Sequence, residues 1–107
     1  MMRELLENTA QRAISYLETL GDRGVNPSVE AVARLATLDE PLTKSPTSPE
    51  EVIRMLDEIC SPATMAMAGP RFFGFVIGGS LPVTVAANWL AGAWDQNSGL
   101  DTPTPAT

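Results

Sequence analysis

The stretch that decides the fold class lies at residues 48–62 and reads SPEEVIRMLDEICSP. Ser48 can cap a helix, Pro49 suits its first turn, and Glu51 completes a capping box. Pro62 ends the pattern. The apolar residues between them share one helical face: Val52, Ile53, Met55, Leu56 and Ile59. This stretch therefore predicts a capped amphipathic helix.

Two helices are predicted before it. Residues 3–20 carry apolar side chains at steps of three and four, and Gly21 follows as a terminator. Asn26 and Pro27 offer a cap and a first-turn proline to a short second helix that ends before Pro41. The apolar positions of the first helix are Leu6, Ala10, Ala13, Ile14 and Leu17.

Charge almost disappears from the chain between residues 65 and 100. The aromatic and β-branched run RFFGFVI at 71–77 predicts one short extended stretch. A helix then opens at Pro82 and continues to about Gln96. The segment is therefore predicted to be mostly α, with three to four helices and one extended stretch.

Composition excludes several functions. The chain has 107 residues and a net charge of −6, which argues against nucleic-acid and anionic-membrane surfaces. It has no histidine and a single cysteine, Cys60, so His-based catalysis, an internal disulfide and a thiolate metal site are not expected. The N-terminus does not read as a secretory signal, and no apolar run approaches the ~20 residues of a membrane span. We expect a cytoplasmic protein.

Two features allow a functional and a structural interpretation. Aromatic residues beside glycines at 71–79 can approach a planar ligand, or can simply pack as a strand that turns into a helix. Trp89 and Trp94 lie about 140° apart around one helix, so they cannot both enter one small core. One of them faces either an interface or solvent.

Several short motifs occur together in this chain. They are LDEPL at 38–42, SPEEV at 48–52, PRFFGF at 70–75, GG at 78–79, ANWLA at 87–91, DQN at 95–97 and PA at 105–106. Together they resemble the N-terminal region of the group II pyridoxal-dependent amino-acid decarboxylases. This family includes the aromatic-L-amino-acid and glutamate decarboxylases.

The resemblance implies an architecture larger than this chain. The full-length family is α/β, with the type I fold of pyridoxal-phosphate-dependent transferases, and its members are homodimers. Residues 1–60 would form a helical lead-in. Residues 61–107 would form the apolar part that lines the substrate pocket and the dimer interface with a second copy of the chain. The cofactor, pyridoxal 5'-phosphate, would be bound by the large domain, which this segment lacks.

By position, the resemblance assigns substrate contacts and no catalytic, cofactor-binding or metal-binding group. The contacts are Phe75, Val76, Ile77 and Gly78 after the Phe-Phe pair, and Asn97, Ser98 and Gly99 after the last helix. Two departures from the family bear on specificity. Gly69 stands where many members have histidine, and Phe75 stands where aromatic-amino-acid members have tyrosine. The more apolar wall disfavours an acidic substrate.

The catalytic groups of such an enzyme are not in this sequence. Its chemistry needs a lysine that bonds the cofactor and, in this family, a histidine that stacks on it. The sole lysine, Lys44, lies in a Pro-rich linker. We therefore expect a truncated piece of a decarboxylase that converts an L-amino acid to an amine, inactive alone. The alternatives are a stand-alone, non-catalytic helical interaction module, and an enzyme that uses the same cofactor for another reaction.

Overall fold

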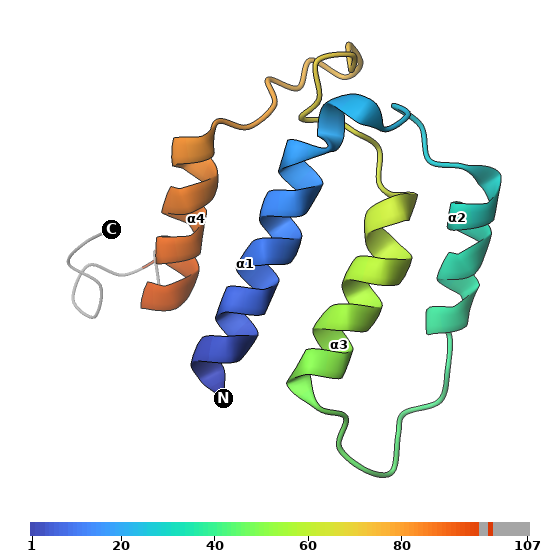
Figure 1. Cartoon of the computed structure of the whole chain (residues 1–107), viewed down its shortest axis with the longest axis vertical. Helices are drawn as coiled ribbons and strands as arrows, with labels where there is room; N and C mark the ends of the chain where they lie inside the picture. The colour runs from blue at the N-terminus through green and yellow to red at the C-terminus, as the bar shows by residue number, and fades with distance from the viewer. Residues whose placement is uncertain (97–98, 100–107) are drawn as a thin grey trace. The chain divides into compact units, whose positions relative to one another are not determined.

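The computed structural model describes residues 1–96 and 99 (Figure 1). The described part contains four α-helices and no strand, so it is mostly helical, as the sequence predicts. The chain divides into two units, Met1–Ile77 and Gly78–Thr107. No helix in the described residues is both long enough and apolar enough to cross a membrane.

The first unit contains α1 (Met2–Glu18), α2 (Val29–Arg34) and α3 (Pro49–Met55). Helix α3 lies between the other two; it runs in the same direction as α1 and opposite to α2 (Figure 1). Short 3-10 turns follow the first two helices, at η1 (Leu20–Asp22) and η2 (Leu35–Leu38).

Helix α3 begins as the sequence predicts. Ser48 is its N-cap, and the Ser48 hydroxyl accepts a hydrogen bond from the Glu51 N–H at 3.2 Å. The reciprocal half of the predicted capping box is not formed, because the Glu51 carboxylate pairs with Arg54 instead. The helix continues as a π-turn, η3 (Leu56–Cys60), and a 3-10 turn, η4 (Ser61–Ala63). Pro62 has no N–H to extend the ladder further.

The predicted cap of the second helix is wrong. The N-cap of α2 is Ser28, with extended backbone, and its hydroxyl accepts a hydrogen bond from the Ala31 N–H at 3.1 Å. Asn26 and Pro27 lie before the helix. A Ser hydroxyl can reach the N–H three residues ahead, and this side-chain contact decides where the helix starts.

Little of the first unit is buried. Leu20 and Ala66 are the buried hydrophobic residues among those described. Ala66 is tied to the loop after η1 by a hydrogen bond from its N–H to the Val25 carbonyl at 3.0 Å. The predicted apolar stripe of α1 remains largely uncovered, since Leu6, Ile14 and Leu17 are all exposed.

The predicted extended stretch at 71–77 is wrong as well. The backbone turns there instead, and Phe75 and Val76 have positive φ angles of 58° and 54°. An extended strand requires negative φ at every non-glycine residue. The aromatic and β-branched composition predicts a strand, but the local backbone does not form one.

The second unit consists of α4 (Pro82–Trp94) and the residues around it. Its first turn is fixed by Thr84, whose hydroxyl accepts from the Leu81 N–H at 3.1 Å and donates to the Leu81 carbonyl at 2.8 Å. Asp95 ends the helix with a left-handed conformation. No residue of α4 is buried, and both tryptophans are about half exposed, Trp89 at 48% and Trp94 at 58%.

Candidate functional site

Residues 71–77 form an apolar, strained turn, which we call the aromatic turn. Two successive non-glycine residues, Phe75 and Val76, adopt the left-handed conformation there. This conformation costs an L-residue roughly 1–2 kcal/mol, and a β-branched side chain such as that of Val76 tolerates it poorly. Backbone strain of this kind is concentrated at binding and catalytic sites, where the surrounding structure maintains it.

The side chains of the turn are presented to solvent. Phe75 is 82% exposed, Phe73 is 91% exposed and Val76 is fully exposed. The Phe75 ring stacks on the half-buried Phe72, with ring centroids 6.5 Å apart. Gly74 lies beside this stack, and a Cβ at that position would be in van der Waals contact with the Phe72 ring at 3.4 Å. The turn therefore offers an apolar wall with an aromatic support behind it.

The base of the turn is attached to η1, the 3-10 turn that follows α1, and to the residue after it. Arg71 donates hydrogen bonds from one guanidinium nitrogen to the carbonyl of Gly21, at 3.1 Å, and to the carbonyl of Arg23. Gly69, just before, packs against the buried pair, since a Cβ there would lie 3.1 Å from the Ala66 carbonyl and 3.5 Å from Leu20.

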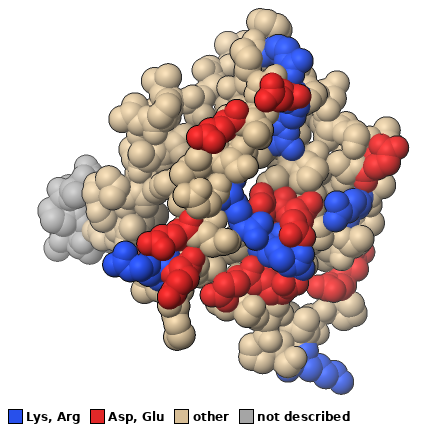
Figure 2. All heavy atoms as spheres, in the orientation of Figure 1, with Lys and Arg blue, Asp and Glu red and all other residues tan. Residues whose placement is uncertain are grey.

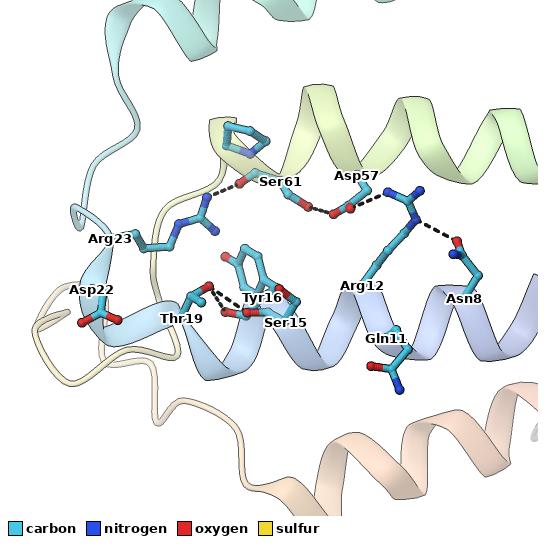
Figure 3. A pocket seen from close by; sticks show the side chains of 11 residues that line it. Asn8, Gln11, Arg12, Ser15, Tyr16, Thr19, Asp22, Arg23, Asp57 and Ser61 are labelled. Carbon is cyan, nitrogen blue, oxygen red and sulfur yellow. Dashed lines mark hydrogen bonds and ion pairs between the residues drawn. The ribbon is translucent and has the colours of Figure 1, made fainter.

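A polar hollow of about 720 Å³ lies between α1 and the end of the α3 helical stretch. Figure 3 shows two arginines reaching across it, Arg12 toward Asp57 and Arg23 toward Ser61. The residues that line it are Asn8, Gln11, Arg12, Ser15, Tyr16, Thr19, Asp22, Arg23, Asp57, Ser61 and Pro62.

The charges of the hollow are compensated from within. Arg12 lies 2.8 Å from the Asp57 carboxylate and donates to the Asn8 side chain at 2.9 Å. Arg23 donates to the Ser61 carbonyl at 2.9 Å, and its guanidinium lies 4.6 Å above the centre of the Tyr16 ring. These contacts join the helices to one another, and they already engage both arginines of the hollow.

Asp57 illustrates what the sequence does not reveal. Its position beside Glu58 predicts a solvated helix face, whereas its side chain is only 29% exposed and is paired with Arg12. The hydrogen bond from Arg12 lowers the pKa of Asp57 below its ordinary value, and a further hydrogen bond from the Ser61 hydroxyl acts in the same direction. No local pattern identifies an ion pair between residues 45 positions apart.

The seven predicted substrate contacts fall into three groups. Phe75, Val76 and Ile77 lie together at the end of the first unit, in the aromatic turn. Gly78 and Gly99 belong to the second unit. Asn97 and Ser98 lie outside the described residues. That all seven line one pocket stays a prediction.

The described residues do not fit pyridoxal phosphate. Lys44 is exposed in the linker before α3 and is not among the residues of the hollow. The sequence contains no histidine to stack on a cofactor ring. The cationic groups of the hollow are already engaged, since Arg12 pairs with Asp57 and Arg23 donates to the Ser61 carbonyl. We therefore derive no cofactor chemistry from this chain.

Comparison of the chain with known proteins gave no further assignment: no family model matches, and neither the curated proteins nor the solved structures contain a match. The resemblance to the decarboxylases therefore rests on the sequence motifs.

Proposed function

We propose that this chain is the N-terminal segment of a pyridoxal-phosphate-dependent carboxy-lyase that decarboxylates an L-amino acid to an amine. In this proposal the segment packs against a cofactor-binding domain and a second copy of the enzyme, and it supplies one wall of the substrate pocket. The catalytic groups lie outside residues 1–107.

The observation that carries the proposal is the aromatic turn. The motif that resembles the decarboxylases, PRFFGF at 70–75, contains the left-handed Phe75 and two highly exposed phenylalanines, Phe73 and Phe75. Apart from its stack on Phe72, Phe75 buries little apolar surface in the isolated chain, and its left-handed backbone costs free energy. The proposed pocket wall gives both features a purpose.

The uncovered apolar faces support the interface part of the proposal. Helix α4 has no charged residue, and Leu90 and Trp94 are exposed one turn apart on it. Figure 2 shows that charged side chains gather in patches on the face in view and leave broad uncharged areas between them. Large exposed apolar surfaces mark contact with another protein surface.

Replacement of Phe75 in the enzyme that carries this segment tests the proposal. Phe75→Ala is expected to change the ratio of kcat/KM between two L-amino acids of different side-chain size by about tenfold or more, because an apolar pocket contact is lost. The affinity for pyridoxal phosphate should stay unchanged. Phe73→Ala is the matched control, since Phe73 is an exposed phenylalanine of the same turn that the proposal does not place at the substrate.

Two outcomes would contradict the assignment. The first is an unchanged substrate preference in Phe75→Ala. The second is a loss of cofactor affinity as large as the loss of activity, which would indicate a structural or cofactor role for Phe75.

The alternative function is that of a helical interaction module without chemistry of its own. The exposed face of α4 suits this function as well as it suits the first. The two candidates differ in whether the polypeptide that carries this segment also holds pyridoxal phosphate.

A further inference from the structure

We propose that Arg71 is a positioning residue: it clamps the aromatic turn to the backbone of η1 and of the residue after it, and so fixes the direction in which Phe75 and Val76 are presented. The inference rests on the proposed function for its enzymatic consequence, because the turn is proposed there as the substrate wall. The clamp itself is a property of this chain and is tested without the enzyme.

The contacts of Arg71 span a long stretch of sequence. Its guanidinium donates to the carbonyls of Gly21 and Arg23, which precede it by 50 and 48 residues. Both carbonyls lie where the helical hydrogen bonds of α1 and η1 end. No N–H further along a helix donates to them, so they can accept from a side chain. A cation at this end of a helix also meets the negative end of the helix dipole.

An arginine suits this position for a geometric reason. One guanidinium nitrogen carries two hydrogens in a fixed plane and can serve two carbonyls at once. Hydrogen bonds from a charged donor are about twice as strong as those between neutral groups. Arg71 therefore holds two backbone points of the η1 turn with a single side chain.

The clamp is connected to the polar hollow through Arg23. The Arg23 carbonyl accepts from Arg71, while the Arg23 side chain covers Tyr16 and donates to the Ser61 carbonyl. The carbonyl that receives the clamp is thus held by the packed ends of α1 and η4. The contacts of Arg23 in the hollow therefore hold the backbone to which the aromatic turn is attached.

The turn needs such a base because its own conformation is unfavourable. Two successive left-handed residues, Phe75 and Val76, persist only when surrounding contacts determine them. Phe75 stacks on Phe72 within the turn. Among the described side chains of the turn, that of Arg71 makes the hydrogen bonds to the rest of the first unit. Without it, we expect Phe75 to leave Phe72 and the turn to sample other conformations.

The three phenylalanines of the sequence all lie in this turn, at positions 72, 73 and 75, which makes a selective experiment possible. The full 107-residue chain is labelled with fluorophenylalanine and its fluorine NMR spectrum is recorded. In Arg71→Met, the Phe72 and Phe75 signals should move toward the position of the free amino acid. The Phe73 signal should stay in place, because that ring is already 91% exposed.

Matched variants separate the clamp from general destabilisation. Arg71→Lys keeps the charge and should recover part of the shift. Arg34→Met removes an exposed arginine at the end of α2 and should leave the spectrum unchanged. Helical circular dichroism should be the same for all variants. Phe72 and Phe75 signals in Arg71→Met that match those of the unmodified chain would overturn the inference.

The enzymatic consequence is measured in the enzyme that carries the segment. A displaced wall is expected to lower kcat/KM by up to about 100-fold in Arg71→Met, mainly through KM, with unchanged cofactor affinity and partial rescue by Arg71→Lys. If the fluorine signals move but KM does not, the positioning role is overturned. If the fluorine signals move in Arg71→Met but Phe75→Ala leaves substrate preference unchanged, the proposed function fails, while the structural role of Arg71 in holding the turn stands. If Phe75→Ala changes preference and Arg71→Met changes nothing, the clamp alone fails.

Discussion

The guanidinium of Arg12 lies 2.8 Å from the carboxylate of Asp57 and joins α1 to the α3 helical stretch across 45 residues of sequence. Both side chains are about three-quarters covered, at 26% and 29% exposure. The buried apolar core of the described residues consists of Leu20 and Ala66. Polar contacts of this kind therefore carry an unusually large share of the packing between these helices.

This pair makes the contact between α1 and α3 dependent on pH. The pKa of Asp57 is lowered in the folded chain, first by the hydrogen bond from Arg12. A carboxyl group whose pKa is lower in the folded chain than in the unfolded chain stabilises the fold. This contribution is fully present at pH values above the ordinary pKa of 3.8, and it is lost as the pH falls through the lowered pKa of the folded chain. Carboxyl-carbon NMR should show that Arg12→Met raises the pKa of Asp57 toward 3.8, whereas Arg34→Met leaves it unchanged. Equal titration curves in the two variants would show that the ion pair is absent in solution.

A substitution at Gly69 tests how tightly the small core around Leu20 and Ala66 is packed. A Cβ there would lie 3.1 Å from the Ala66 carbonyl, tighter than nine in ten natural contacts of this kind, and 3.5 Å from the Leu20 side chain. Gly69→Ala is expected to destabilise the region by about 1–3 kcal/mol through overpacking. The Ala66 N–H donates to the Val25 carbonyl. Its amide hydrogen exchange should accelerate by about tenfold for each 1.4 kcal/mol by which the free energy of opening is lowered. Gly21→Ala is the control, because nothing lies within 4 Å of a Cβ at that position.

A substitution at Ser48 tests whether its side chain caps the first turn of α3. Its hydroxyl accepts from the Glu51 N–H, and Ser48→Ala should weaken the first turn by about 1 kcal/mol. Carbon chemical shifts of the residues after Pro49 report the loss of helix directly. Ser45→Ala, in the same linker but away from the cap, should leave them unchanged. Equal effects of the two substitutions would show that the cap is not responsible.

The apolar face of α4 should make the chain self-associate when it is studied alone. Leu90 and Trp94 are exposed four residues apart, so they share one face of the helix. The double substitution Leu90→Gln and Trp94→Gln should lower the apparent mass seen in sedimentation velocity. Leu42→Gln removes an even more exposed leucine from the linker and should have no effect. If the chain with its original sequence is a monodisperse monomer that melts cooperatively, the interface proposal is contradicted.

The helices of this chain could be predicted because their signals are local. Ser48 lies three residues before the N–H that it caps, and Pro82 opens α4 at the position that proline prefers. The α2 cap was missed because Asn26, Pro27 and Ser28 all suit a helix start. The contact between the Ser28 hydroxyl and the Ala31 N–H decides among them.

The site could be predicted only in part. The motif at 70–75 identifies the aromatic turn, but its composition predicts a strand, and no residue type signals the positive φ of Phe75 and Val76. Arg71 and Arg23 bond backbone carbonyls, which every residue has, so their partners cannot be read from a pattern. The structure of the turn depends on contacts between residues about 50 positions apart, such as Arg71 and Gly21.

The most direct test of the central claim is to isolate, from its native source, the polypeptide that carries residues 1–107 and to ask whether it holds pyridoxal phosphate. The preparation is reduced with borohydride, digested and analysed by mass spectrometry, and release of CO₂ from L-amino acids is measured in parallel. We expect a pyridoxyl group on a lysine outside residues 1–107, together with CO₂ release. A polypeptide that holds no pyridoxal phosphate and releases no CO₂ would contradict the account and favour the interaction module.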